Sequence, residues 1–447
     1  SSSCEWGEIM SPEILILLMF GFLMIGIFAG GHLAFVLGGL SVIFGYFGWG
    51  PQAFSLFVQR MHTVTLNYVL CAVPLFVFMG FVLEKARIAE DIFEALSLYF
   101  RRVRGGLAIA TTGVCAILGM CTGVVAASII AAGVIALPPM LKRGYDKKMV
   151  LGTVAAGGTL GILIPPSIML IFYAAESGIS AGKLFAAAFT PGLLLAALYA
   201  IYIYVMARIH PEMAPPPENN DEKIPLKTYL ASLKGVIPVG TLILAVLGAI
   251  LFGIATPTEA AGTGAFASLV IAAFYRRLSW AMVWECCIKS VETIGMIGFI
   301  LITANCFSTV FLGMGGQEIV TDLLTGSGLS SYVILFIILT VIFVLGMFID
   351  WIGILYICLP TFIAVADLMG WNQLWLALIV CICLQTAWLT PPFGYALFFL
   401  RGIAPEEITF GDIIKGCLPF IALQMIGVGL CIVFPQIITW LPNLIYG

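Results

Sequence analysis

The sequence predicts an all-α polytopic membrane protein that contains an inverted-topology repeat. Composition is the first of three observations behind this prediction. The 447-residue chain is 62% hydrophobic and 10% charged, with a mean hydropathy of +1.12. Soluble proteins carry roughly 45–50% apolar and about 25% charged residues, so the natural solvent of this chain is lipid. The net charge of -3 and the lack of a basic face give no indication of a nucleic-acid partner.

The second observation is a series of long apolar runs. A helix needs about 20 apolar residues to cross the hydrocarbon core, and the sequence offers roughly ten candidates. They are residues 13–29, 33–48, 68–84, 149–175, 184–207, 235–253, 257–275, 291–312, 374–400 and 414–436. No basic segment precedes the first run, so it is predicted to be a retained span and not a signal peptide.

The third observation is the placement of lysine and arginine. Basic residues cluster in 85–104, 142–148, 208–234 and 276–277, whereas the connections 176–182, 254–259, 313–329 and 367–373 contain none. The positive-inside rule places the first group in the cytoplasm and the second outside. The N-terminus is then predicted to lie outside.

Two segments begin and end on the same side of this predicted topology. Residues 105–141 lie between two basic clusters and contain two short apolar arms joined at Thr122 and Gly123. Residues 330–366 lie between two connections without basic residues and are interrupted at Ile349 and Asp350. Both segments are predicted to be re-entrant hairpins, one opening to each side.

The sequence that follows each hairpin is also similar. Pro138 corresponds to Pro360, and Gly178 to Gly402. The pair of prolines in TLGILIPPSIML, residues 159–170, corresponds to the pair in LTPPFGYALF, residues 389–398. The same order with opposite sidedness indicates an inverted repeat.

The proline pairs predict two broken helices. Each proline lacks a backbone N–H and leaves carbonyls of the preceding turn unpaired. Irregular backbone survives in lipid only where protein or a watery cavity surrounds it. One such pair could be a simple kink, but two matched pairs, each after a hairpin, favour a site where free carbonyls hold a small cation.

The runs GYDKK, GGTLGILIPPSIMLIFYAAESGIS and LTPPFGYALFFLRGIAPEEIT resemble the large membrane subunit of tripartite ATP-independent periplasmic (TRAP) transporters. The resemblance extends from about Glu13 to the C-terminus. It implies a sodium-coupled secondary importer with an elevator-type mechanism in the bacterial inner membrane. It also implies two partners, a small four-helix membrane subunit and a periplasmic binding protein that delivers a small organic anion.

The resemblance further implies about two co-transported Na⁺ ions, each between a hairpin tip and a broken helix. The first sodium site would comprise Thr122, Gly123, Val125, Gly161, Ile164 and Pro166. The second would comprise Gly346, Met347, Asp350, Thr386, Thr390 and Pro392. The substrate would contact Arg401, Ser128, Ser167 and Gly394. Many family members have Ser-Gly-Ser-Ser at the first tip, where this chain has Thr122-Gly123-Val124-Val125, so the first ligand set differs in its hydroxyls.

Asp350 and Arg401 each allow two interpretations. Asp350 either caps the following hairpin arm or acts in ion ligation or gating, because an ionised carboxylate in an apolar environment is costly without a partner. Arg401 either extends to the cytoplasmic interface or pairs with a substrate carboxylate or sulfonate.

The predicted domains combine these elements. They are N-terminal scaffold helices at 1–67, a first repeat at 68–207 with its broken helix at 149–175, a cytoplasmic linker at 208–234, scaffold helices and an arm at 235–290, and a second repeat at 291–447 with its broken helix at 374–400. Amphipathic stretches 87–100 and 279–289 are predicted to lie along the membrane interface.

Other function classes fit less well. The 12 cysteines are scattered, without a CxxC pair or a Cys/His cluster, so a zinc site or a disulfide framework is not expected. Paired aspartates, a Ser/His dyad and HExxH are absent from the spans, which argues against an intramembrane enzyme. The remaining alternative is a sodium/anion symporter of a related elevator family that works without a binding protein. The sequence leaves open which anion is carried, with a keto acid, an aromatic acid and an isethionate-like sulfonate as candidates.

Overall fold

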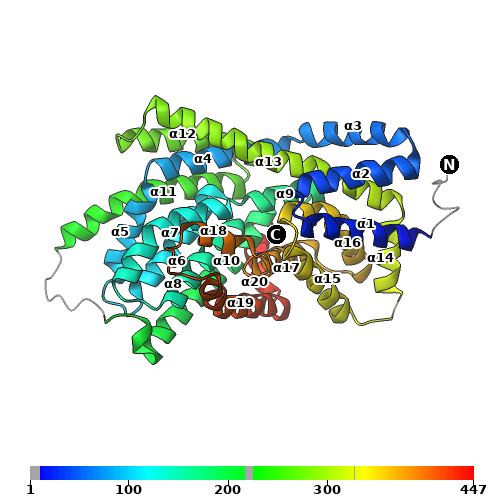
Figure 1. Cartoon of the computed structure of the whole chain (residues 1–447). Coiled ribbons are helices and arrows are strands. Elements are labelled where there is room, and N and C mark those ends of the chain that lie inside the picture. The colour runs from blue at the N-terminus through cyan, green and yellow to red at the C-terminus, as the bar shows by residue number, and fades with distance from the viewer. Residues whose placement is uncertain (1–10, 217–224, 327) are drawn as a thin grey trace.

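A computed structural model describes residues 11–216, 225–326 and 328–447, and these residues form helices without any strand (Figure 1). The first half contains α1 (Pro12–Phe28), α2 (Leu33–Trp49), α3 (Gln52–Thr65), α4 (Ala72–Lys85), α5 (Ile88–Phe100), α6 (Gly106–Thr122), α7 (Val125–Lys142), α8 (Lys147–Thr159), α9 (Ile168–Ser177) and α10 (Ala181–Ile209). The second half contains α11 (Leu226–Leu251), α12 (Pro257–Phe274), α13 (Trp280–Gly313), α14 (Gly316–Thr325), α15 (Ser331–Gly346), α16 (Trp351–Met369), α17 (Gln373–Ala387), α18 (Tyr395–Ile403), α19 (Phe410–Val433) and α20 (Gln436–Tyr446). Short 3₁₀ turns occupy η2 (Tyr68–Cys71), η3 (Leu160–Ile162) and η4 (Pro211–Met213).

The all-α membrane class is confirmed. Seven helices in the described residues are long and apolar enough to cross a membrane, and six shorter apolar helices accompany them. Many large apolar side chains face outward, including Phe35 at 69% exposure and Phe336 at 69%. Such a surface suits hydrocarbon and would be unfavourable in water.

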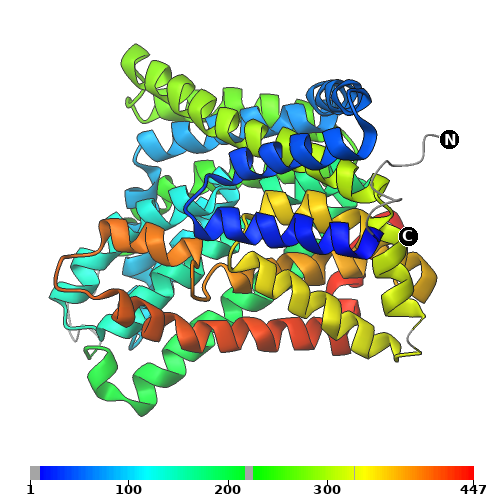
Figure 2. The same cartoon turned by 45° about the vertical axis from the view of Figure 1, so that its right-hand side comes forward.

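The long helices pack alongside one another. α2 lies along α13, and α12 lies along α4, as Figures 1 and 2 show. α13 has 34 residues, which at 1.5 Å per residue gives a length of ~51 Å, more than the ~30 Å of a hydrocarbon core. The predicted arm 279–289 and the predicted span 291–312 are therefore one continuous helix and not separate elements.

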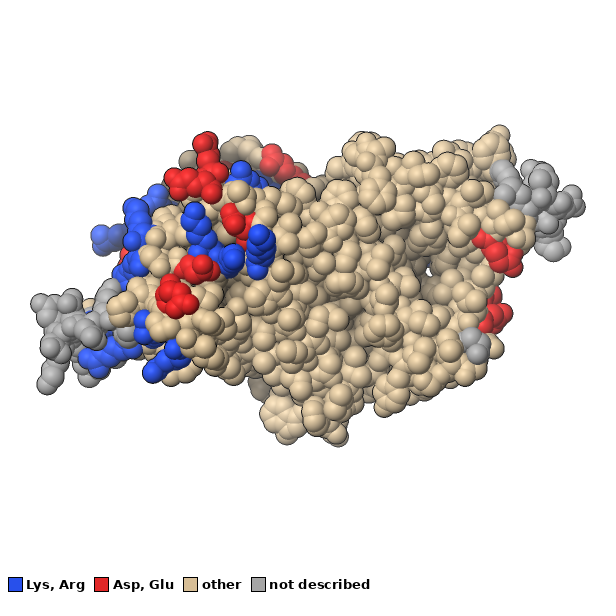
Figure 3. Space-filling model, turned by 60° about the horizontal axis from the view of Figure 1, so that its bottom comes forward, with Lys and Arg blue, Asp and Glu red and all other residues tan. Residues whose placement is uncertain are grey.

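Charged side chains are concentrated at the ends of the molecule. Figure 3 shows lysine and arginine gathered at one end and a broad uncharged surface in the middle. An ion pair of 2.8 Å between Arg277 and Asp91 joins the segment after α12 to α5. This distribution agrees with the basic cytoplasmic end that the sequence predicts.

Among the described residues, three helices lie outside all the predicted spans, hairpins and interfacial stretches, namely α3, α14 and α20. The first two, QAFSLFVQRMHTVT and GQEIVTDLLT, mix apolar and polar residues. A search for runs of about 20 apolar residues misses such short amphipathic helices.

The predicted linker 208–234 is only partly irregular. Residues 211–213 form a 3₁₀ turn, residues from 226 onward already belong to α11, and 217–224 lie outside the described residues. Residues 1–10 lie outside them too.

The two predicted hairpin tips are helix boundaries. α6 ends at Thr122 and α7 begins at Val125, with Gly123 between them at φ 59°, a left-handed conformation that favours glycine. α15 ends at Gly346 and α16 begins at Trp351, so residues 347–350 form the second tip.

The two predicted broken helices are interrupted at the proline pairs. Residues 163–167 separate η3 from α9, and residues 388–394 separate α17 from α18. Each half thus contains two helices joined at a tip, followed by a helix with a break. The opposite orientation of the halves stays a prediction.

Candidate functional site

A cavity of about 440 Å³ lies where both tips and both breaks meet. Its walls include the first tip at 123–126, the second tip at 350–352, residues on both sides of the first break and residues of the second break. The α1–α2 connection and α13 close another side. The lining residues are Gly31, His32, Leu33, Gly123, Val124, Val125, Ala126, Ile162, Ile168, Thr293, Met296, Ile297, Ile300, Asp350, Trp351, Ile352, Trp388, Tyr395 and Phe399.

The first tip is held by its own hydroxyl groups. Thr122 Oγ1 donates to the Leu118 carbonyl at 3.0 Å and lies 3.0 Å from Ser128 Oγ. Ser128 Oγ in turn donates to the Val124 carbonyl at 3.2 Å. These bonds fix the path of the backbone around Gly123.

The first tip packs backbone to backbone against its surroundings. A Cβ atom on Gly119 would lie 2.2 Å from the Cα of Gly161, and one on Gly80 of α4 would lie 2.6 Å from the Cα of Thr122. Side chains at these glycines would separate the chains, so the contacts depend on glycine. The last turns of α6 therefore lie directly against η3, the turn that precedes the first break.

The first break leaves carbonyl groups available. Leu163 and Ile164 N–H groups both donate to the Leu160 carbonyl, at 3.0 and 2.9 Å. The carbonyls of Leu163 and Ile164 accept no hydrogen bond from the residues that the structure describes. Ser167 Oγ donates to the Ile162 carbonyl and accepts from the Leu170 N–H, which caps α9.

The second tip is held against the second break. Tyr395 Oη donates to the Phe348 carbonyl at 3.4 Å, and a Cβ atom on Gly346 would lie 2.7 Å from the Cβ of Ala387. The Asp350 carboxylate accepts from the Ile352 N–H at 3.4 Å and caps α16. The cap that one interpretation of Asp350 predicts is thus present, and Asp350 is also among the residues that line the cavity.

The second break offers oxygens of the same kind. Thr386 Oγ1 donates to the Ile382 carbonyl, and Thr390 Oγ1 donates to the Thr386 carbonyl, both at 3.0 Å. The carbonyls of residues 389–393 accept no hydrogen bond from the described part of the chain. Carbonyl, hydroxyl and carboxylate oxygens are the ligands that a hard cation such as Na⁺ prefers.

The two broken helices are linked to each other. Gln385 Nε2 of α17 donates to Thr159 Oγ1 of α8 at 3.1 Å, and Gln424 Nε2 of α19 donates to the same oxygen at 3.4 Å. All three side chains are fully buried. Thr159 is the last residue of α8, before η3 and the first break, and Gln385 precedes Thr386, so this bond joins the helices that lead into the two breaks.

None of the four predicted substrate contacts lines the cavity. Arg401 is exposed and its guanidinium donates to the Ile408 carbonyl, so the structure does not bring it to the cavity. Ser128 and Ser167 are buried and bind the backbone of Val124 and Ile162, which do line it. Gly394 is the N-cap of α18, with φ 52°. In this geometry the two serines hold the backbone of lining residues in place and do not themselves line the cavity.

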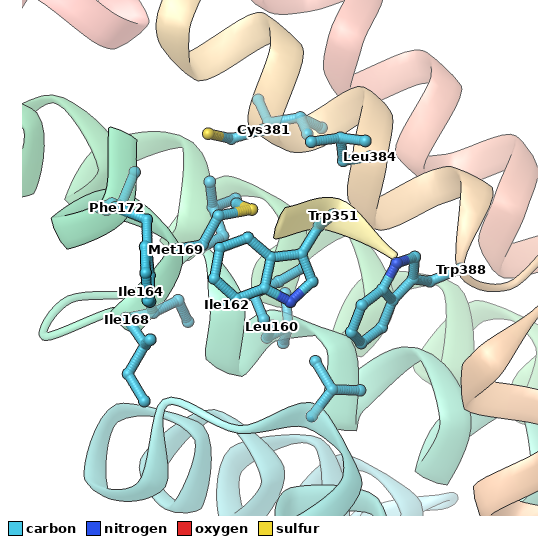
Figure 4. Close-up of a cluster of buried hydrophobic side chains, with 14 of the residues drawn as sticks. Leu160, Ile162, Ile164, Ile168, Met169, Phe172, Trp351, Cys381, Leu384 and Trp388 are labelled. Carbon is cyan, nitrogen blue, oxygen red and sulfur yellow. The ribbon is translucent and has the colours of Figure 1, made fainter. Parts of the chain in front are cut away.

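The aromatic lining was not predicted. Figure 4 shows the indole of Trp351 near Ile162, with the indole of Trp388 on the other side of Trp351; all three residues line the cavity. Trp388 also lies against Tyr395, with ring centroids 5.7 Å apart. A tryptophan within an apolar run is indistinguishable in sequence from one that fills a core, so the sequence carried no signal for this role.

No group of three or more His, Cys, Asp or Glu side chains in the described residues could hold a metal ion. The scattered cysteines in this part of the chain are free. Any cation bound at the tips would depend chiefly on backbone and hydroxyl oxygens.

Comparisons with known proteins agree with this architecture. The chain is 30% identical over 396 residues to the C4-dicarboxylate TRAP transporter large permease protein DctM of Pseudomonas aeruginosa, covering 88% of this chain and 91% of that protein. It is also 30% identical over 438 residues to the ectoine/5-hydroxyectoine TRAP transporter large permease protein UehC of Ruegeria pomeroyi, covering 97% and 98%.

The solved structure of the YdaH transporter of Alcanivorax borkumensis has a similar fold. Its TM-score is 0.64 at 15% identity, and the match covers 95% of this chain and 99% of that one. The model of the family described as the tripartite ATP-independent periplasmic transporter, DctM component, matches residues 16–437. The chain therefore belongs to this family as a large membrane permease component.

Proposed function

We propose that this chain imports a small organic anion across the bacterial inner membrane and that Na⁺ drives the import. The observation that carries the proposal is the pairing of two glycine-containing tips with two interrupted helices around one cavity. Each pairing presents unpaired carbonyls beside hydroxyl groups. Two Na⁺ ions bound there would order the tips and supply positive charge near the substrate.

The family assignment indicates the rest of the assembly. The relatives are named as transporter permeases, so the chain is a transporter component and not an enzyme. A small four-helix subunit and a periplasmic binding protein would complete the system, and the binding protein would deliver the anion. Sliding of the tips and breaks as one body against α1, α2 and α13 would then carry the cavity inward.

Sodium binding is tested first with the metal alone. The melting temperature of the purified chain in detergent is measured in NaCl and in choline chloride at equal ionic strength. We expect a saturable rise in NaCl, because a ligand that binds only the folded state stabilises it by RT ln(1 + [L]/Kd). At 100 times Kd the stabilisation is about 2.7 kcal/mol.

Asp350→Asn is expected to weaken this sodium response about tenfold in apparent affinity, since it removes the charged oxygen at the second tip. The matched control is Asp367→Asn, the same change on α16, where the carboxylate is exposed and accepts from Gln373 Nε2 at 2.6 Å. Equal melting temperatures in the two salts would reject sodium binding. Transport is then tested in proteoliposomes with both partners, where uptake that ignores the sodium gradient would reject the coupling.

A further inference from the structure

The cavity between the tips has an unusual lining for an anion site. Four aromatic residues, Trp351, Trp388, Tyr395 and Phe399, share the wall with aliphatic side chains of both tips, the first break and α13. Besides the polar groups of these aromatic side chains, the charged or polar side chains of the lining are those of His32, Thr293 and Asp350, and no lysine or arginine of the described residues lines it. Such a wall favours a ligand with a flat apolar body.

Trp388 provides a donor that the protein leaves unused. Its side chain is 5% exposed, and its buried Nε1–H has no hydrogen-bond partner among the described residues. The neighbouring tryptophans differ, because Trp371 Nε1 donates to Ser331 Oγ at 2.6 Å and Trp375 Nε1 donates to the Cys431 carbonyl at 3.0 Å. A buried donor without an acceptor is unfavourable unless a ligand supplies one.

The N-terminus of α7 provides further donors on the same wall. Its N-cap, Val124, makes no side-chain cap, and the Val125 and Ala126 N–H groups have no acceptor in the described part of the chain. By contrast, Ser167 caps α9 and Asp350 caps α16. The first turn of an 18-residue helix carries about half a positive charge, so an oxyanion is favoured there.

The charge of the lining limits the ligand to one negative group. The α7 N-terminus can bind one oxyanion. Asp350 adds a negative charge to the wall, and only a cation bound at the second tip would neutralise it. A second carboxylate on the ligand would find no lysine or arginine on the wall. A dianion is therefore disfavoured relative to a monoanion.

We propose that the cavity selects an organic monoanion with a planar apolar body, on the size scale of benzoate, and that Trp388 is a specificity-determining residue. The oxyanion lies at the N-terminus of α7, the body lies against the aromatic wall, and Trp388 Nε1–H donates to an oxygen of the ligand. This inference rests on the proposed transport function and names its substrate class.

The test uses three probes with the purified chain and its small subunit. Isothermal titration calorimetry is run with benzoate, with cyclohexanecarboxylate and with succinate, in NaCl and again in choline chloride. Cyclohexanecarboxylate has the charge and carbon skeleton of benzoate without its planarity, and succinate has two charges and no apolar body. We expect benzoate to bind at least tenfold more tightly than succinate and at least threefold more tightly than cyclohexanecarboxylate.

Two variants separate the donor from the packing. Trp388→Phe keeps an aromatic ring and removes the N–H, and we expect it to weaken benzoate binding about tenfold. Trp375→Phe makes the same change in α17, the helix that directly precedes Trp388. The Trp375 N–H donates to the Cys431 carbonyl outside the cavity. This control variant should bind benzoate with an affinity within twofold of that of the original chain. Melting temperatures confirm that both variants fold.

The outcomes distinguish this inference from the proposed function. Preference for succinate, binding of none of the probes, or equal benzoate affinity in Trp388→Phe and the original chain would overturn the inference, even if binding required Na⁺. Selective benzoate binding that is the same in both salts would sustain the inference and count against sodium coupling.

Discussion

Individual glycines determine whether the first tip can meet the first break. At Gly119 and Gly161 the two backbones approach so closely that a methyl group on either has no room, and the obstructing atoms belong to backbone and cannot rotate away. Other glycines lack this constraint. Gly295 of α13 has no atom within 4 Å of an added Cβ.

Gly119→Ala is expected to destabilise the folded state by about 2–3 kcal/mol and to abolish the sodium response of the melting temperature, because overpacking moves the tip from the break. Gly295→Ala is the control and should be neutral or slightly stabilising, since alanine favours a helix over glycine by up to about 1 kcal/mol. Equal melting temperatures for the two variants would show that the close contact between Gly119 and Gly161 is not required for the stability of the fold.

At the scale of elements, the sequence predicts the helices that are long or strongly punctuated. Thr122-Gly123 and the two proline pairs mark the tip and the breaks correctly, because glycine and proline change backbone geometry directly. The sequence predicts the residues of the cavity wall less well. Trp351 and Trp388 occur in apolar runs, and Arg401, which is charged and conspicuous in sequence, bonds to Ile408 elsewhere.

The bond between the two broken helices is another feature without a sequence signal, since Thr159 and Gln385 are 226 residues apart. Thr159→Val leaves two buried glutamine amides without their acceptor, and we expect a loss of about 1–3 kcal/mol in stability. We also expect the Hill coefficient for Na⁺ to fall towards 1, because the link joins the two helices that lead into the proposed cation sites.

Thr153→Val is the matched control for that prediction. Thr153 lies on the same helix and is fully buried, but its hydroxyl has no hydrogen-bond partner among the described residues. Its replacement should change neither stability by more than about 0.5 kcal/mol nor the Hill coefficient. A Hill coefficient that Thr159→Val leaves unchanged would exclude the coupling role.

At the scale of the whole molecule, the distribution of charge sets the orientation in the membrane. The basic clusters predict which connections are cytoplasmic, and Figure 3 shows lysine and arginine at one end. The C-terminal helix α20 lies beside one of the connections that contain no lysine or arginine. A Cβ on Gly182 would lie 2.8 Å from Tyr446 Oη, and residues 176–182 are predicted to lie outside.

Alkaline phosphatase, which is active only outside the cytoplasm, is therefore expected to be active when fused after Gly447. A fusion to the chain truncated after Arg277 should be inactive, because that connection carries two arginines and is predicted to be cytoplasmic. Phosphatase activities in whole cells, normalised to expression, make the comparison. Inactive enzyme at the C-terminus would contradict the predicted sidedness.

The approach of Gly80 to Thr122 bears on the balance between conformations. α4 touches the first tip there with no side chain between them, so the arrangement described here exists only while residue 80 has no Cβ. Any bulk at this position would raise the free energy of this arrangement and leave unaffected a conformation in which the tip has moved away. If the first tip moves as the proposed mechanism requires, the residue at position 80 would then set the balance between the two positions of the tip before any ion or substrate binds.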